Sequence, residues 1–445
     1  MKSKLIIIIA LFTISLSQAQ LRKWTLQECV EYAVENNLTV EQFELDLENA
    51  KIDKSDAIGA LLPDLNGTPR LTENIGLSFN PTSQEPVNTQ LNYTGDLTST
   101  VTIFDGLRNY NRLNRAKLNA IANQYRLDDL KDDIRLNVAN AYLQVLSNKE
   151  QLKTFEAQYA VTEQDLNRTK ELVASGVVPR GDLLEIEATA ANQEQQIVNG
   201  EGLVLISRVS LAQLLQITDY ENFDIADESF EIPPSDILKN SPKVIFDKAL
   251  SFRNDIKLSQ ANVELAEKDV DIAKGAYYPT LSAFINYNTR YSDQNLDPTD
   301  LSIIPFTDQL WIFDGLAYGL QMNIPFFNGW SARNGVKRSK ITLERAKLQF
   351  ELDKLDLETT IQQAYVDVTT FRKAYDAAEK TLEARRLAYD YAKERYDVGL
   401  MNAFDFGQAQ ARVDNAEADV IRTKYDYIFR LKILEFYYGI PIKLN

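Results

Sequence analysis

The sequence has no histidine, one cysteine (Cys29) and only three methionines in 445 residues. Without histidine the chain cannot form a Ser-His-Asp triad, a histidine general base or a histidine metal ligand. A single cysteine excludes an intrachain disulfide and the cysteine clusters that hold zinc or iron and sulfur. Lysine and arginine (48) are outnumbered by aspartate and glutamate (64), and the net charge of −16 argues against nucleic-acid binding. Glycine (17) and proline (13) are scarce for this length, which favours long uninterrupted elements.

No other catalytic pattern compensates for these absences. Serine and acidic residues are plentiful, but they have no histidine or cysteine partner, and the chain contains no Walker loop and no dinucleotide-binding fingerprint. We therefore predict that the protein is not an enzyme and that it holds no cofactor and no metal ion.

The N-terminus is typical of an exported protein. Lys2 and Lys4 precede an apolar run over residues 5–16, and small residues follow at positions 17 and 19. This run is too short for a membrane-spanning helix. We predict a signal peptide over residues 1–19, with cleavage between Ala19 and Gln20.

The remainder of the chain repeats its own pattern. Pro63 meets Pro279 at a shift of 216 residues. At a shift of 223, Phe-Asp-Gly at 104–106 meets Phe-Asn-Gly at 327–329, and Gly176 meets Gly399. A nearly constant shift over such a length indicates internal duplication. The predicted domains are a first structural repeat at 20–217, a linker at 218–242 and a second structural repeat at 243–445.

Each repeat has the same predicted order of elements. A helix of about 25 residues ends at the proline, two strands follow, and then a helix of about 70 residues turns at the glycine into a helix of about 37. The strands are predicted at about 64–104 and 280–326, and the long helical hairpins at about 107–217 and 330–440. The fold class is therefore mainly α, with long coiled-coil-like helices and a two-stranded β-hairpin in each repeat.

The predicted strands alternate between apolar and polar residues, more weakly in the first of them than in the other three. On the last strand the apolar positions are Leu316, Tyr318, Leu320, Met322 and Ile324. Such alternation is typical of transmembrane β-strands, although a soluble sheet with one face on a helical core has the same period. Four strands cannot close a barrel, and lipid does not tolerate open sheet edges. A transmembrane barrel would therefore be shared, with eight strands from two copies or twelve from three.

This pattern resembles the TolC-like outer-membrane factor family over essentially the whole mature chain. Prolines at 63 and 279 stand at the helix-to-strand junctions, and Phe-Asp-Gly or Phe-Asn-Gly opens each long helix. The helix turns also match, with Ser-Gly-Val at 175–177 and Arg-Tyr-Asp-Val-Gly-Leu at 395–400.

The resemblance implies a specific assembly and a passive function. It implies a homotrimer with a 12-stranded β-barrel in outer-membrane lipid and a hollow α-helical barrel in the periplasm. Such a duct serves a tripartite efflux pump or a type I secretion system, together with a periplasmic adaptor protein and an inner-membrane transporter. The alternative is a periplasmic coiled-coil adaptor or scaffold that is not inserted into the membrane.

Acidic residues follow both helix turns. Asp182 and Glu185 open the first returning helix and Asp405 opens the second, where carboxylates stabilise the positive end of the helix dipole. In the family, acidic residues at the start of the last long helix form the periplasmic entrance constriction. Asp405 matches the first of them, whereas Gln408 stands at the second position and Met401 replaces a preceding basic residue.

The turns place apolar residues at helix tips. Gly176 and Val177 form the first tip, and Gly399 and Leu400 form the second. Turn chemistry alone accounts for the glycines. The resemblance adds a second expectation, namely that these tips dock onto the helical hairpins of the adaptor.

Overall fold

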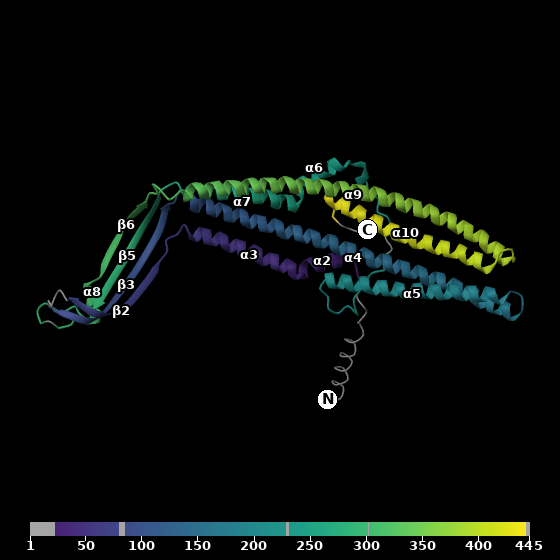
Figure 1. Ribbon diagram of the computed structural model, residues 1–445, viewed down its shortest axis with the longest axis horizontal. Coiled ribbons are helices and arrows are strands. Elements are labelled where there is room, and N and C mark those ends of the chain that lie inside the picture. The colour runs from purple at the N-terminus through teal and green to yellow at the C-terminus, as the bar shows by residue number, and fades with distance from the viewer. Residues whose placement is uncertain (1–22, 80–84, 228–230, 301, 442–445) are drawn as a thin grey trace, which may run out of the picture. The chain divides into compact units, whose positions relative to one another are not determined.

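The computed structural model describes residues 23–79, 85–227, 231–300 and 302–441 (Figure 1). The predicted signal peptide and the cleavage site at Ala19 and Gln20 lie outside the described residues. Figure 1 labels the elements in chain order. The helices are α2 (Leu26–Asn36), α3 (Leu38–Gly59), α4 (Arg108–Ala174), α5 (Arg180–Leu214), η1 (Ile237–Lys239), α6 (Pro242–Phe252), α7 (Asn254–Gly275), α8 (Phe306–Ile312), α9 (Ser331–Asp397) and α10 (Ala403–Tyr437). The strands are β1 (Lys23–Trp24), β2 (Asn66–Phe79), β3 (Pro86–Phe104), β4 (Asp224–Ile225), β5 (Thr280–Ser292) and β6 (Gly315–Asn323).

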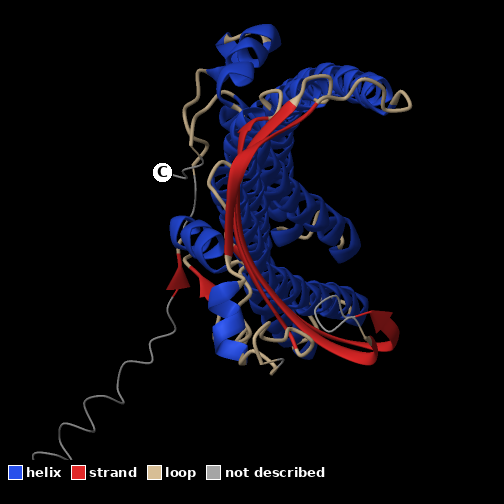
Figure 2. Ribbon diagram, turned by 90° about the vertical axis from the view of Figure 1, so that its left-hand side faces the viewer, coloured by secondary structure: helices blue, strands red, loops and turns tan. Residues whose placement is uncertain are grey.

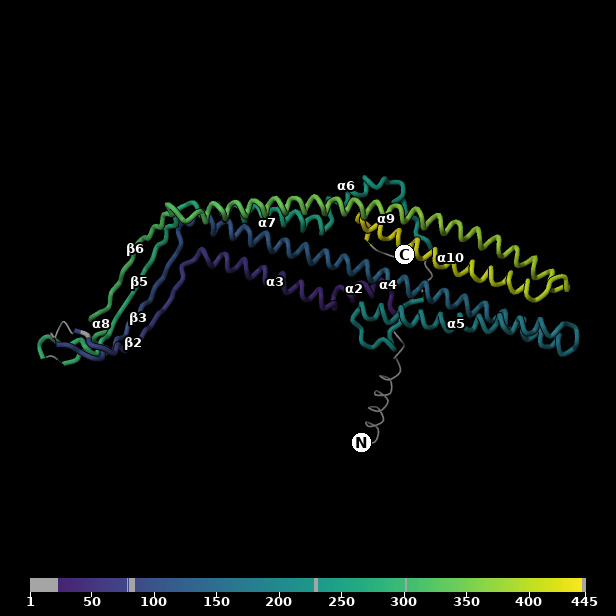
Figure 3. Tube along the Cα trace, viewed as in Figure 1, coloured from purple at the N-terminus to yellow at the C-terminus, as the bar shows by residue number. Residues whose placement is uncertain are grey.

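The long helices agree closely with their sequence-based bounds. Helices α4 and α9 each contain 67 residues, and the returning helices α5 and α10 each contain 35. In each pair the shorter helix follows the longer one after a short turn and runs in the opposite direction, as the trace in Figure 3 shows. The four predicted strands correspond to β2, β3, β5 and β6.

The predicted helices of about 25 residues before Pro63 and Pro279 correspond to α3 and α7, each of 22 residues. A helix of 11 residues that was not predicted precedes each of them: α2 is divided from α3 at Asn37, and α6 is divided from α7 at Arg253. Both dividing residues have extended backbones, with ψ of 121° and 132°. Arg253 is only 7 % exposed and pairs with the partly exposed Asp255 at 2.7 Å, so an ion pair accompanies the second break.

The chain separates into two compact units, to which α4 and α9 both contribute. The first, the sheet unit, comprises residues 45–125 and 257–351. Its antiparallel sheet has the strand order β2-β3-β5-β6 and is strongly curved (Figure 2). Much of the register between β5 and β6 aligns apolar with apolar and polar with polar residues. Leu320 lies opposite Ala283, and Gln321 lies opposite Ser282.

The segment between β5 and β6 contains the short helix α8, which was not predicted from the sequence. Gln309 on α8 is fully buried and organises this segment. Its side chain donates to the carbonyls of Ser292 (2.9 Å) and Ile304 (2.7 Å) and accepts from the Asn295 side chain (2.7 Å). These bonds satisfy the buried amide, as a dry site requires.

The second unit, the helical unit, comprises the described parts of residues 1–44, 126–256 and 352–445. Its core consists of fully buried large side chains, among them Tyr142, Leu146, Leu211, Ile428 and Leu434. Cys29 is also fully buried, and burial raises the pKa of its thiol to about 12. The cysteine therefore packs as a small apolar residue and is not reactive.

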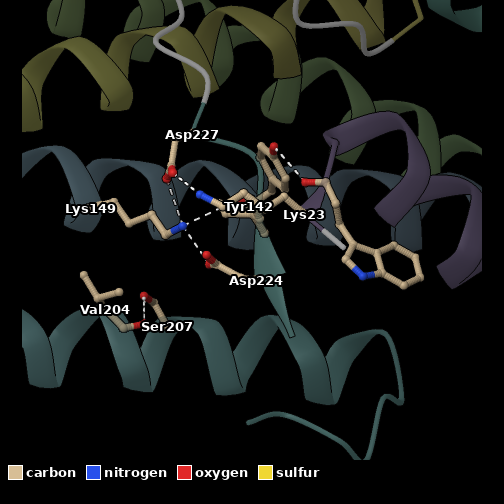
Figure 4. Close-up of polar contacts among 9 residues, drawn as sticks. Lys23, Tyr142, Lys149, Val204, Ser207, Asp224 and Asp227 are labelled. Atoms are coloured by element: carbon tan, nitrogen blue, oxygen red, sulfur yellow. Dashed lines mark hydrogen bonds and ion pairs between the residues drawn. The ribbon is translucent and has the colours of Figure 1, made fainter. Parts of the chain in front are cut away.

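A cluster of charges holds the two short strands of the helical unit (Figure 4). Strand β1 pairs in parallel with β4, so the predicted linker at 218–242 contributes a strand. Lys149 on α4 binds Asp224 at 2.6 Å and Asp227 at 3.0 Å, and Lys23 also pairs with Asp227. The hydrogen bond from Lys23 lowers the pKa of Asp227 to about 2. Ion pairs through Asp227 therefore connect the start of the described chain to α4.

Candidate functional site

Two helix turns carry the tips that the sequence predicted. Gly176 and Gly399 have φ of 74° and 76°, a left-handed conformation that glycine adopts without steric cost. The amide after each glycine donates to the carbonyl five residues earlier, at 2.9 Å in the first turn and 2.7 Å in the second. This pattern ends a helix in a sharp reversal. Val177 and Leu400 are 68 % and 72 % exposed, so both turns present an apolar side chain to solvent.

The acidic residues after the turns differ in their surroundings. Asp405 is exposed in the first turn of α10, where its amide donates to the Asn402 side chain at 2.7 Å. The Asn402 amide in return donates to the Asp405 carboxylate at 3.0 Å. Asp182 and Glu185 are partly buried on α5, and Gln408 is exposed. Among the described residues, no hydrogen bond or ion pair joins Asp182, Glu185 or Gln408 to Asp405.

An aromatic stack joins α9 to α10 near the second turn. Phe406 is 4 % exposed and lies parallel to Tyr396, with ring centroids 4.6 Å apart. Tyr389 stacks on the same ring at 5.5 Å. Burial raises the pKa of Tyr396, and the negative charge of Asp182 raises it further. Asp182, at the start of α5, therefore lies close to the end of α9.

A polar seam connects the helices further from the turns, and its buried glutamines were not predicted. We use the name polar seam for three side-chain hydrogen bonds: Gln158 to Glu417 (2.9 Å), Gln193 to Asp414 (3.0 Å) and Gln410 to Thr162 (2.8 Å). All three involve α10, with partners on α4 or α5. The glutamines are at most 8 % exposed. The spacing of apolar residues does not show whether a glutamine on a helix is buried or exposed, so these buried glutamines could not be predicted from the sequence.

A cavity of about 560 Å³ lies beside the polar seam. Gln158, Gln410, Asp414 and Glu417 line it, together with Arg386, which pairs with Glu417 at 2.8 Å. Burial raises the pKa of Asp414 to about 6, although the hydrogen bond from Gln193 opposes the shift. The site therefore changes charge between mildly acidic and neutral pH.

The sheet has one apolar and one polar face. Its register places Leu320, Ala283 and Val101 in one cross-strand row, and Gln321, Ser282 and Thr102 in the adjacent row. Because successive side chains point to opposite faces, the apolar row lies on one face and the polar row on the other. The next two rows on the apolar face are Tyr318–Ile285–Ser99 and Leu316–Tyr287–Leu97, which are apolar or aromatic except for Ser99. On β6 the exposed fractions are 66 % for Leu316, 79 % for Tyr318 and 68 % for Leu320.

No helix in the described part of the chain combines the length and the apolar character needed to cross a membrane. Within the same residues, no group of three or more acidic or sulfur-bearing side chains is arranged to hold a metal ion.

A curved four-stranded sheet together with two long helical hairpins is the fold of solved outer membrane channels. The CmeC outer membrane channel of Campylobacter jejuni matches with a TM-score of 0.80 and 18 % identity, over 93 % of this chain and 85 % of that chain. The outer membrane protein VceC of Vibrio cholerae matches with a TM-score of 0.78 and 17 % identity, over 94 % of this chain and 97 % of that chain.

The sequence itself assigns the family. The model of the outer membrane efflux protein family matches residues 30–215 and 245–439, and the chain belongs to this family. A probable efflux pump outer membrane protein of Pseudomonas putida, TtgC, is 24 % identical over 64 % of this chain, and the match spans 56 % of TtgC. The outer membrane protein TolC of Vibrio cholerae is 22 % identical over 83 % of this chain and 80 % of its own length.

Proposed function

We propose that the protein is the outer-membrane exit duct of a tripartite efflux pump or a type I secretion system. The observation that carries this function is the two-faced sheet of the sheet unit, with strands β2 and β6 at its edges. Leu316, Tyr318 and Leu320 on β6 are more than 60 % exposed, which water disfavours and lipid accepts. Family membership agrees with a position in the outer membrane.

The two sheet edges support assembly from several copies. Each edge strand has backbone groups on one side that no described residue of this chain pairs. An unpaired amide or carbonyl costs several kcal/mol in lipid, so β6 of one copy must pair with β2 of another. Three copies of a four-stranded sheet give a closed barrel of twelve strands, the homotrimer that the family resemblance implies. The polar face then lines a water-filled lumen.

The helical unit supplies the entrance and the docking tips in this proposal. Three copies of Asp405, with Asp182 and Glu185 nearby on α5, form an acidic constriction, which Gln408 leaves less charged. The tips at Gly176–Val177 and Gly399–Leu400 meet a periplasmic adaptor, because exposed apolar side chains at a helix turn favour a partner. The adaptor connects the duct to an inner-membrane transporter. A passive duct needs no catalytic residue and no cofactor.

The rival interpretation is a periplasmic coiled-coil adaptor or scaffold without membrane insertion. In such a protein the exposed apolar face of the sheet would be in contact with water, which is unfavourable. It would be released from cells without detergent, whereas the proposed duct remains with the outer membrane until detergent extracts it as a complex of three chains.

A pair of neighbouring substitutions on β6 tests the proposal. Leu320→Arg places a charge on the apolar face and is expected to cost about 2–4 kcal/mol near the membrane midplane. Gln321→Arg is the matched control, because the same charge then lies on the polar face. Membrane fractionation and native mass of the detergent-solubilised complex should show loss of assembled trimer for Leu320→Arg only. Equal damage from both variants, or release of the wild type without detergent, would overturn the proposal.

A further inference from the structure

The starts of the two longest helices are basic, although the chain as a whole is acidic. Between Asp314 and Glu344 the only charged residues are Arg333, Lys337, Arg338 and Lys340. Between Asp105 and Asp128 they are Arg108, Arg112, Arg115, Lys117 and Arg126. Two separate all-basic stretches in a chain of net charge −16 indicate local selection for positive charge.

Three of the four cations at the start of α9 lie on one face, and no described carboxylate neutralises them. Arg333, Lys337 and Lys340 follow one another at intervals of four and three residues, which places them on the same side of α9. Trp330 directly precedes the helix and lies against Arg333. All four are exposed, whereas Ala332 is only 7 % exposed on another side. Among the described residues, no carboxylate forms an ion pair with Arg333, Lys337 or Lys340.

The start of α4 is different, because carboxylates accompany its cations. Arg115 binds Asp269 at 2.6 Å, and Arg108 and Arg112 lie 3.8 and 3.9 Å from Asp105. Charge on α4 is therefore partly used in packing the sheet unit, whereas charge on α9 is available to a ligand.

An aromatic pocket adjoins the basic face of α9. It has a volume of about 230 Å³, and its lining includes Tyr277, Pro325, Phe326, Phe327, Trp330 and Arg333. Phe326 and Phe327 are 91 % and 77 % exposed, and the Arg333 guanidinium lies 5.1 Å from the centre of the Trp330 ring.

The backbone of Trp330 carries a steric cost. Its φ of 69° lies in the left-handed region, which is unfavourable for a residue with a large side chain. The conformation nevertheless leaves the indole 58 % exposed. Leu107 has the same conformation at the first junction, so the two junctions share the turn, but the second one presents an aromatic ring to solvent.

We propose that this aromatic-basic face, formed by Trp330, Arg333, Lys337 and Lys340, binds the headgroup of an anionic membrane phospholipid. The inference rests on the proposed function, because that function places β6, which ends at Asn323, in the membrane just before the face begins. Arg333 offers a planar fork of donors to the phosphate, and the two lysines add point charges. The aromatic rings suit the boundary between headgroup and acyl chain, where amphipathic rings accumulate. Positive charge beside a bilayer favours anionic over zwitterionic lipid.

Native mass spectrometry of the delipidated, detergent-solubilised complex tests this inference. The probes are phosphatidylglycerol and phosphatidylcholine with identical acyl chains, and inorganic phosphate as a competitor. We expect wild type to bind phosphatidylglycerol at least about tenfold more tightly than phosphatidylcholine. The triple variant Arg333→Gln/Lys337→Gln/Lys340→Gln should lose that preference. The control Lys373→Gln/Lys380→Gln/Arg385→Gln removes three exposed charges from the distal part of the same helix and should keep it.

A second variant separates the aromatic contribution from the charge. Trp330→Leu introduces the residue that stands 223 positions earlier, Leu107. It should weaken binding of both lipids several-fold and leave the preference for phosphatidylglycerol intact, because the three cations remain.

The outcomes distinguish this inference from the proposed function. If the triple variant remains a membrane-inserted trimer and binds both lipids as wild type does, the headgroup site is wrong and the duct stands. Displacement of the lipid by millimolar phosphate would identify a site for free anions and overturn the lipid assignment. Loss of the trimer in the triple variant would instead assign the face to contact between copies. A wild type that is not inserted in membranes would overturn both proposals.

Discussion

The two junctions where a strand leads into a long helix have the same backbone but different surroundings. At the first, Gly106 and Leu107 have φ of 72° and 62°; at the second, Gly329 and Trp330 have φ of 61° and 69°. The first junction is packed, because an added Cβ at Gly106 would lie 2.4 Å from the carbonyl oxygen of Gly275. At Gly329 the same Cβ would meet no described atom within 4 Å.

The residue before each glycine differs in the same way, because it is buried at the first junction and exposed at the second. Asp105 is only 7 % exposed, accepts from the Asn109 amide at 2.9 Å and thereby caps the start of α4. Asn328 is exposed, and Arg333, Lys337 and Lys340, which follow it at the start of α9, form no ion pair with a described carboxylate. A shared local motif therefore fixes the turn, whereas the neighbours decide whether the turn serves packing or surface recognition.

The largest expected effect comes from glycine substitutions at the two junctions. Gly106→Ala adds steric strain at positive φ and a backbone clash, and we expect it to destabilise the protein by about 2–4 kcal/mol. Gly329→Ala adds the strain alone and should cost about 1 kcal/mol. Thermal denaturation in detergent measures both. Equal losses would mean that the packing against Gly275 contributes nothing and that the two junctions are equivalent.

The turns themselves were predictable, and their surroundings were not. Phe-Asp-Gly and Phe-Asn-Gly mark both junctions in the sequence, and alternation predicted the four strands. The approach of Gly106 to Gly275 joins residues far apart in the chain, so no local pattern encodes it. Helix α8 escaped prediction because its seven residues are too few to display a helical period. The burial of Gln309 depends on loop contacts that exist only in the folded protein.

A second contrast lies in the polar seam of the helical unit. Positions 193 and 414 hold Gln193 and Asp414, while the positions 223 residues away hold Ala416 and Ala191. The seam therefore places a polar pair at one site and small apolar residues at the corresponding site. Helical periodicity predicted the apolar side chains but could not distinguish an inward-facing glutamine from a surface one.

The second prediction uses the pH dependence of that pair. The pKa of Asp414 is raised from 3.8 to about 6, so the folded protein binds more protons than the unfolded chain between these values. The contribution of Asp414 to stability is therefore lost as pH rises through this window. Asp414→Asn should stabilise the protein at pH 7 by about 1–2 kcal/mol and have little effect below pH 4.

Apparent melting temperatures in detergent at several pH values between 4 and 7 check this expectation. The control is Asp419→Asn on the same helix, whose side chain is 59 % exposed and whose removal should leave the pH profile unchanged. Parallel profiles for wild type and Asp414→Asn would show that the carboxylate is ionised throughout and that the seam does not respond to pH.

The two helix tips differ in how the returning helix begins, which gives the smallest expected effect on stability. Helix α5 starts after Pro179, and no side chain among the described residues caps it there. Helix α10 starts after Asn402, which exchanges hydrogen bonds with Asp405. Asp405 therefore has two separable roles, a structural one in the cap and the proposed one as part of an acidic constriction.

Single-channel recording in planar bilayers, with hexamminecobalt as a blocking cation, separates these roles. Asp405→Ala should weaken the block and cost at most about 1 kcal/mol of stability. Asn402→Ala should cost about 1 kcal/mol through loss of the cap while keeping the block, because the Asp405 charge remains. The wild-type block should weaken as salt reduces the Debye length below about 10 Å, since it arises between separated charges in water. A blocking constant that Asp405→Ala leaves unchanged would restrict Asp405 to its role in the helix cap, and the two tips would then differ only in how they fold.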